Sequence, residues 1–216
     1  MNSKKQTDEE RRAAEFLEEA YALDSEANAL AFYDRWAEEY DAQVENGLHY
    51  LAPRVLAEAL VRHQVPGDGA VLDVGCGTGL TGRCLHALGF TTIDGLDLSA
   101  AMLEKAREKD VYRNLTQADL NAPLAIDDGV YATVVCSGTF TQGHVGPEPL
   151  DELFRVLVPG GFLACTVHGK VWESMGFDAK LAGLEETGVI RAAEQGLGEY
   201  FAGAEKIAWY CVFEKR

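Results

Sequence analysis

Apolar residues in the N-terminal part of the chain recur with the period of an α-helix. Within LAFYDRWAEEYDAQV, at about 100° per residue, one narrow arc contains Tyr33, Trp36, Ala37, Tyr40 and Val44. Asn46-Gly47 ends this helix, and YLAPRVLAEALVRHQV forms a second amphipathic helix that Pro66-Gly67 ends. The pattern therefore predicts helices over residues 8–64.

From Gly69 onward, short apolar runs alternate with helical segments. The runs that predict strands are AVLDV, TTIDGLDL, YRNLTQADL, YATVVCSGTF and GFLACTVHG. The helical segments between them are GLTGRCLHAL, SAAMLEKAREK, in which Ser99 is the N-cap, and EPLDELFRVL. This alternation requires right-handed crossovers, so it predicts a parallel sheet with helices on both faces.

The C-terminal part breaks the alternation. VWESMGFDAKLAGLEETG predicts a helix, but VIRAAEQ and KIAWYCVFE are two strand-like runs with no helix between them, so we expect them to pair antiparallel. The chain of 216 residues is long enough for one domain and a helical appendage. We expect an N-terminal helical lid over residues 1–65 and an α/β domain over residues 66–216.

Composition narrows the class of protein. The five cysteines have no CxxC pair, which argues against a disulfide framework and a metal site; they are Cys76, Cys84, Cys136, Cys165 and Cys211. The segment MNSKKQTDEERRAAEF is charged where a signal peptide would be apolar. No run approaches the roughly 18 apolar residues of a membrane span. We therefore expect a cytoplasmic protein with no membrane partner.

The chain is strongly acidic, with 19 Lys and Arg against 35 Asp and Glu, a net charge of −16. Lys and Arg supply most non-specific affinity for nucleic acid, and a field of this sign opposes it. The sequence also lacks a basic cluster with interleaved aromatic residues. We therefore do not expect nucleic acid as a partner.

The turn after the first predicted strand is rich in glycine. In VLDVGCGTGL, Gly75, Gly77 and Gly79 follow Asp73. Doubly wound sheets bind ligands beyond the carboxyl ends of their strands, which is where this turn lies. The GxGxxG fingerprint of dinucleotide sites would place a third glycine at Leu80, and the spacing here is GxGxG instead.

Acids close the first three predicted strands. Asp97 lies 22 residues after Gly75, where a carboxylate can accept both hydroxyls of a ribose and repel a 2′-phosphate. Asp119 closes the third strand in QADL, within reach of an adenine amine. Each acid alone is equally consistent with a cap or a turn, but three at successive strand ends, counting Asp73, indicate a ligand site.

These motifs together resemble a known family. VLDVGCGTGL, GLDLSAAML, QADL and VLVPGGFL are similar to the class I S-adenosylmethionine-dependent methyltransferases, from about Leu30 to the C-terminus. FYDRWAEEYDAQV and GTFTQGHVGPEPLDELFRVLVPGGFL resemble, more narrowly, the methyltransferase-like proteins of the Williams–Beuren region. The resemblance implies a Rossmann-like α/β fold, with a seven-stranded, mainly parallel sheet whose last strand is antiparallel.

The resemblance also implies a cofactor, S-adenosylmethionine, which leaves as S-adenosylhomocysteine. Gly75 and Gly77 would admit its methionine part, Asp97 would hold the ribose, and Ser137 would lie beside the methyl group. The residues implied around the adenine are Leu98, Met102, Asp119 and Leu120. A pocket mouth formed by Asp73, Asp97 and Asp119 suits this cationic ligand better than the anionic pyrophosphate of NAD.

The aromatic arc of Tyr33, Trp36 and Tyr40 has two interpretations. It is either a stripe that faces a core or, as the resemblance favours, a lid over the cofactor with cation–π attraction of about 0.5–2 kcal/mol. The predicted activity is methyl transfer to a small-molecule O, N or S nucleophile. Alternatives are a protein methyltransferase, a nicotinamide-dependent oxidoreductase and a non-catalytic binding module. His144, in FTQGHVGPEP, is the candidate general base.

Overall fold

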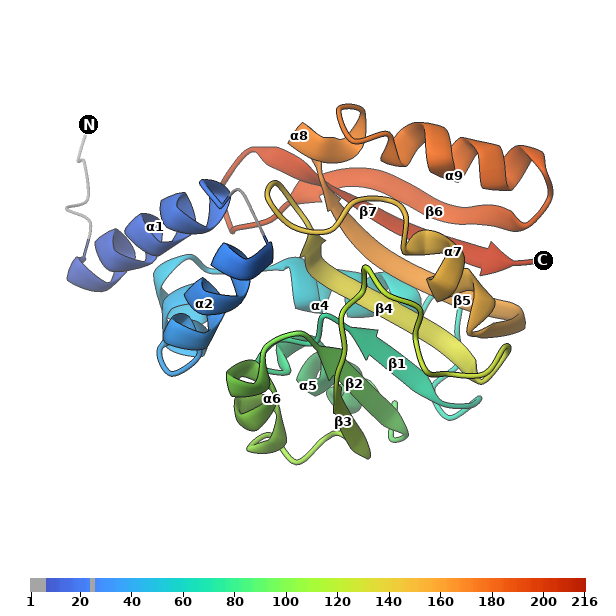
Figure 1. Cartoon of the computed structure of the whole chain (residues 1–216), viewed down its shortest axis with the longest axis horizontal. Coiled ribbons are helices and arrows are strands. Elements are labelled where there is room, and N and C mark those ends of the chain that lie inside the picture. Colours follow the sequence, from blue (N-terminus) through green and yellow to red (C-terminus); the bar gives the residue numbers. More distant parts are fainter. Residues whose placement is uncertain (1–6, 24–25) are drawn as a thin grey trace.

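The structure is a computed structural model, and it describes residues 7–23 and 26–216 (Figure 1). Its described part contains a seven-stranded sheet in the order β3-β2-β1-β4-β5-β7-β6. The strands are β1 (Val71–Val74), β2 (Ile93–Asp97), β3 (Asn114–Gln117), β4 (Tyr131–Phe140), β5 (Leu157–His168), β6 (Ile190–Glu199) and β7 (Lys206–Lys215). β7 pairs antiparallel with both β5 and β6, and the strands from β3 to β5 pair parallel. The predicted mainly parallel sheet with an antiparallel last strand is confirmed.

The helices follow the predicted order with more interruptions. They are α1 (Asp8–Tyr21), α2 (Glu26–Trp36), α3 (Tyr40–Ala42), the π-helical turn η1 (Gln43–Gly47), α4 (Ala52–Leu60), α5 (Leu80–Ala87), α6 (Ala100–Arg107), α7 (Leu150–Arg155), α8 (Gly169–Trp172) and α9 (Phe177–Glu186). The predicted helix around the aromatic arc is wrong in one respect, because α2 ends at Trp36. The predicted cap of α6 is confirmed, since the Ser99 hydroxyl accepts from the Met102 amide at 3.1 Å. None of the described helices is both long and apolar enough to cross a membrane.

The alternation of side chains along each strand builds a core on both faces of the sheet. One face carries Leu72, Val134 and Leu163 and packs against α7, α8 and α9. The other carries Val71 and Val135 and packs against α4 and α5. Successive strand residues point to opposite faces and both faces are covered, so these buried strands are mainly apolar. The expected cover of helices on both faces is confirmed.

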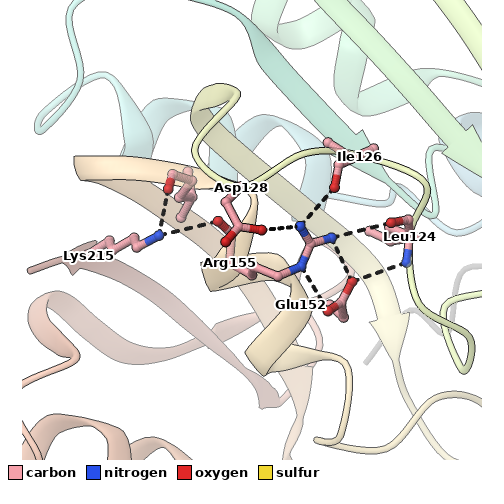
Figure 2. Close-up of polar contacts among 7 residues, drawn as sticks. Leu124, Ile126, Asp128, Glu152, Arg155 and Lys215 are labelled. Atoms are coloured by element: carbon pink, nitrogen blue, oxygen red, sulfur yellow. Dashed lines mark hydrogen bonds and ion pairs between the residues drawn. The ribbon is translucent and has the colours of Figure 1, made fainter.

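Polar contacts connect the chain segments at the amino ends of β4 and β5 (Figure 2). Arg155, the last residue of α7, donates to the carbonyls of Ile126 and Leu124 at 2.8 and 3.3 Å and pairs with Glu152 and Asp128. Lys215, at the end of β7, donates to the Leu157 carbonyl at 2.7 Å. These contacts anchor the loop that enters β4, at the end of the sheet away from the glycine turn.

A cap formed by α1, α2, α3 and η1, residues 7–23 and 26–47, lies beside the sheet (Figure 1). Its apolar cluster contains Phe32, Trp36 and Val44. In contrast, Leu56 and Leu60 of α4 are fully buried against the sheet, so α4 belongs to the core. We therefore propose that the lid ends before α4 and not at residue 65; residues 1–6 of the expected lid lie outside the described residues.

Candidate active site

A cavity of about 1080 Å³, including its open mouth, lies at the carboxyl ends of β1, β2 and β4 and beneath the cap. This is the point where the strand order reverses, with β1 between β2 and β4. Eleven of the residues proposed from the sequence line it: Tyr33, Tyr40, Gly75, Gly77, Asp97, Leu98, Met102, Asp119, Leu120, Ser137 and His144. The structure therefore brings the glycine turn, two of the acids and the candidate base to one cavity.

The glycine turn is held in place by the carboxylate of Asp97. One oxygen of Asp97 accepts from the Gly77 amide at 2.8 Å, and the other accepts from the Ser99 amide at 2.9 Å. Gly77 has a φ of +54°, and a Cβ added to it would meet nothing within 4 Å. Because Gly77 lines the cavity, this open space is room for a ligand beside the backbone.

The other glycines of the turn serve packing. A Cβ at Gly75 would lie 2.2 Å from Oγ1 of Thr139, so this glycine lets the turn approach β4. Gly79 precedes α5, and a Cβ there would lie 2.9 Å from the ring of Tyr112. Gly79 is absent from the cavity wall, so it shapes the turn without facing the ligand space.

The two acids of the cavity differ in their surroundings. Burial raises the pKa of Asp97, although the amides of Ser99 and Gly77 oppose the shift. Asp119 is half-buried and accepts from the Asn121 amide at 2.7 Å. Both side chains keep lone pairs for a ligand, because a carboxylate offers about four acceptor positions.

The prediction that Asp73 lies at the pocket mouth is wrong. Asp73 is 1% exposed and is not part of the cavity wall. It shares a face of β1 with Val71, since residues two apart in a strand point the same way, and it accepts from the Tyr112 hydroxyl at 2.6 Å. Burial raises the pKa of Asp73 to about 7, and the Tyr112 hydrogen bond only partly opposes this shift.

The aromatic arc divides between the cavity and the interior of the cap. Tyr33 and Tyr40 line the cavity, whereas Trp36 does not. Trp36 is 3% exposed and stacks on Phe16 with ring centroids 5.3 Å apart. Its Nε1 donates to Oε1 of Gln43 at 2.7 Å. The arc therefore contains two residues that line this cavity and one, Trp36, that does not.

His144 lies at the boundary between the cavity and the cap. Its Nδ1 is 2.8 Å from the Gln142 carbonyl and 2.9 Å from the Thr141 hydroxyl, and its Nε2 is 2.9 Å from the Tyr33 hydroxyl. A carbonyl can only accept, so Nδ1 carries the proton and Nε2 accepts from Tyr33. Burial lowers the pKa of His144, which keeps the ring neutral near pH 7.

Some cavity residues carry no signal in the sequence, because only the tertiary fold brings them to the cavity. Tyr50 lines it from the loop after η1, where it forms a bridge to Phe201 beyond β6. Leu30 of α2 and Thr139 of β4 line it as well. No local pattern marks Tyr50, because its position depends on a pairing with the far end of the chain.

The chemistry of this wall fits a cationic nucleoside. Its described charged residues are Asp97 and Asp119, and they are accompanied by no Lys or Arg. Oγ of Ser137 is buried without a hydrogen-bond partner in the described structure, which leaves one polar group for a ligand. No cluster of metal-ligating side chains occurs within residues 7–23 and 26–216. The fold and the cavity together define the class I S-adenosylmethionine-dependent methyltransferases.

Comparison with known proteins gives the same class. A family model described as a methyltransferase domain matches residues 71–161. The chain is 34% identical over 177 residues to human methyltransferase-like protein 27. This alignment covers 79% of this chain and 71% of that relative. The chain therefore belongs to the S-adenosylmethionine-dependent methyltransferases, and the predicted cofactor, enzyme class and resemblance are confirmed.

Other relatives match shorter segments. Trans-aconitate 2-methyltransferase from Paracidovorax citrulli is 37% identical over 113 residues, 50% of this chain and 42% of that protein. An 18S rRNA (guanine-N(7))-methyltransferase from Arabidopsis thaliana is 42% identical over 69 residues, 31% of this chain and 24% of that protein. The fold is that of a TehB-like S-adenosylmethionine-dependent methyltransferase from Corynebacterium glutamicum, with a TM-score of 0.63, 19% identity and 86% of this chain and 99% of that chain covered.

Proposed function

We propose that this protein transfers the methyl group of S-adenosylmethionine to an O, N or S nucleophile of a small molecule. One observation carries the proposal: a single cavity joins the glycine turn, Asp97, Asp119 and the base His144. The cofactor supplies a methyl group that is already activated by its sulfonium. The protein's part is to orient the acceptor, exclude water and receive a proton, and orientation alone is worth about 7–11 kcal/mol.

The cavity residues divide the proposed cofactor between them. Asp97 would hold the ribose hydroxyls, and Leu98 and Met102 would flank the adenine, with Asp119 and Leu120 at its edge. The space beside Gly77 would admit the methionine part, and the free Oγ of Ser137 would face the methyl group. Tyr33 and Tyr40 would cover the cofactor from the cap.

Two features support a small acceptor over a macromolecule. The cap covers the cavity, and the net charge of −16 opposes a polyanion. A relative named for trans-aconitate favours a small acceptor, but another is named for rRNA, so the exclusion of nucleic acid remains a proposal. We also propose a cytoplasmic location, because all five cysteines are free, which suits a reducing compartment. A protein acceptor is the second candidate, and a non-catalytic binding module is the third.

Calorimetric titration with S-adenosylhomocysteine tests the cofactor site. Asp97→Asn should weaken binding by roughly 10- to 150-fold, because ligand hydroxyls lose a charged acceptor worth about 1.5–3 kcal/mol. Asp94→Asn is the matched control, since Asp94 lies on the same strand and pairs with Arg113 away from the cavity. Equal affinities for both variants, or a preference for NAD, would contradict the placement.

The acceptor class needs a second measurement. We expect S-adenosylhomocysteine to be released in the presence of a mixture of metabolites below about 1 kDa, with no labelled methyl group in protein or nucleic acid from the same extract. Label in protein alone would select the second candidate. Cofactor binding without any transfer to either fraction would select the third.

A further inference from the structure

A second cavity, of about 490 Å³ including its mouth, adjoins the first beneath the cap. The two cavities share five lining residues, Tyr33, Tyr40, Tyr50, Gly138 and His144. The remaining walls come from α1, from the cap cluster and from the tip of the β6–β7 hairpin. We call this space the acceptor cavity, because it meets the first one at the candidate base.

The walls of the acceptor cavity are mainly aromatic. Tyr21, Trp36, Tyr200 and Phe201 join the three shared tyrosines. The rings are arranged in contact, with Tyr50 stacked on Tyr200 at 5.8 Å between centroids and an interplanar angle of 6°. Aromatic rings bind other rings by offset stacking and edge contacts, worth about 0.5–1.5 kcal/mol for each pair beyond burial. A flat, ring-shaped ligand fits these walls best.

None of the described residues that line the acceptor cavity is Asp, Glu, Lys or Arg. A carboxylate or an ammonium group bound there would lose its hydration without gaining a partner of opposite charge. The aromatic faces could attract a cation, but the lining holds no acid to complete such a site. The lining therefore selects an uncharged ligand.

The Tyr33–His144 pair stands where the two cavities meet. Tyr33 donates its phenolic proton to Nε2 of His144, so the Tyr33 oxygen has lone pairs left to accept from a ligand. A neutral amine attacks with its own lone pair and needs no buried base beforehand. A hydroxyl on an aromatic ring, with an ordinary pKa of about 10, must lose its proton to become a strong nucleophile.

Resting on the methyl transfer proposed above, we infer that the acceptor is an uncharged phenol, held in the acceptor cavity with its hydroxyl on Tyr33. The phenolic proton passes to the Tyr33 oxygen as the Tyr33 proton passes to Nε2 of His144. The acceptor oxygen forms its bond to the methyl carbon while the carbon–sulfur bond breaks and its electron pair stays on sulfur. The imidazolium of His144 then releases its proton to water.

The first test is binding, which does not depend on turnover. The protein is saturated with S-adenosylhomocysteine and titrated by calorimetry with three compounds that share one aromatic ring. They differ in a single substituent, which is a hydroxyl in the phenol, an aminomethyl group in the amine and a carboxylate in the acid. We expect the phenol to bind at least tenfold more tightly than the charged compounds. If S-adenosylhomocysteine itself does not bind, the proposed function fails. If it binds and the phenol has no preference, only the present inference is overturned.

The second test is methylation of two phenols, one weakly acidic and one electron-poor phenol that is already ionised at neutral pH. Tyr33→Phe and His144→Gln should each slow the weakly acidic phenol by roughly 10²–10⁴-fold and the ionised phenol by less than about tenfold. The matched controls are Tyr210→Phe and His86→Gln, which lie outside both cavities and should match wild type. Equal losses for both phenols, or none for either, would overturn the relay.

The pH profile gives a third readout. Tyr33 is the titratable side chain in contact with the His144 ring, and Asp97 and Asp119 face the pair across the first cavity. Burial lowers the pKa of His144 from its usual 6.5. As the pH is raised, wild-type turnover of the weakly acidic phenol should therefore increase at pH values below 6.5, where His144 loses its proton, and stay constant above them. In Tyr33→Phe the rate should instead keep climbing toward the pKa of the phenol. A wild-type plateau that survives in Tyr33→Phe would contradict the inference.

Discussion

The cap and the sheet body are held by different forces. The body buries apolar side chains on both faces of the sheet, and residues such as Leu153, Leu157 and Leu163 are fully buried there. The cap has only a small aromatic cluster of its own, and Leu80 of α5 is the body's one buried contribution to it among the described residues. The body therefore depends on hydrophobic burial, and the cap depends more on what ties it to the body.

Five of those ties are polar contacts in which the cap supplies the acid. Asp34 accepts from the Ser99 hydroxyl at 2.5 Å, Asp41 accepts from Thr78 and from Lys109, Glu38 pairs with Lys105, and Glu45 pairs with Arg83. Thr78 and Ser99 also line the larger cavity. Glu38–Lys105 and Glu45–Arg83 are more exposed than Asp41–Lys109, and exposed ion pairs contribute about 0.2–1 kcal/mol each. We therefore expect that separating the cap requires less free energy than opening the core. We infer that the cap is the part that opens to admit ligands.

The largest expected effect breaks the body. Leu163→Ala removes a fully buried side chain at the centre of the sheet and should lower the free energy of unfolding by about 2–5 kcal/mol. The matched control is Leu88→Ala, because Leu88 is 37% exposed and should change stability by less than about 0.5 kcal/mol. Urea unfolding followed by circular dichroism measures both. Equal losses in the two variants would contradict a body held by burial.

An intermediate effect concerns Asp73, an acid that is buried in the body. Its pKa is about 7 in the folded protein against 3.8 ordinarily, so the folded state holds its proton more strongly. Its contribution to stability is therefore full below pH 3.8 and is lost as the pH rises to about 7, by about 1.4 kcal/mol per unit. The variant Asp73→Asn has no such loss. Its free energy of unfolding should therefore increase relative to that of wild type as the pH is raised from 5 to 8.

The control for this measurement is Asp94→Asn. Hydrogen bonds from Arg113, Asn114 and Tyr131 lower the pKa of Asp94 despite its burial. Stability from Asp94 is therefore present above its ordinary pKa of 3.8 and lost as the pH falls below it. The loss caused by Asp94→Asn should be the same at pH 5 and pH 8. Melting temperatures at both pH values decide, and a flat difference for Asp73→Asn would contradict its raised pKa.

The smallest expected effect loosens the cap. A double-mutant cycle of Asp41→Asn and Lys109→Gln should give a coupling of about 1 kcal/mol or less, decreasing with added salt. The loss should appear as weaker affinity for S-adenosylhomocysteine and faster amide exchange in the cap, with an unchanged melt of the sheet. If the whole protein loses stability instead, the cap and the body unfold as one unit.

The parts of the site that sequence patterns could predict are local. Asp97, Ser99 and Gly77 are placed by a strand end, a helix start and a turn, and all three were found because such signals span a few residues. The direction of a side chain was harder to predict. Asp73 was misplaced because its position near a strand end does not show that it points, with Val71, under α5.

Contacts between distant segments were missed entirely. Tyr50 and Phe201 meet through a bridge that no local pattern indicates, and Tyr200 follows from the same pairing. Trp36 was misassigned for a related reason, because the helical arc continues through it while the chain turns after it to form α3. Patterns of hydrophobic residues predict which face of a helix or strand is apolar. Which segment packs against that face depends on tertiary packing.

The bridge between Tyr50 and Phe201 joins two distant segments of the chain at the wall of the acceptor cavity. The Leu51 amide donates to the Tyr200 carbonyl at 2.8 Å and the Ala202 amide donates to the His49 carbonyl at 3.0 Å, so backbone hydrogen bonds hold this junction alongside the stacked rings of Tyr50 and Tyr200. Because these backbone hydrogen bonds do not depend on side-chain identity, we expect them to persist when the rings at positions 50, 200 and 201 are exchanged. We propose that variation at these three positions changes which acceptor is bound, while Asp97 and the glycine turn keep the same cofactor site.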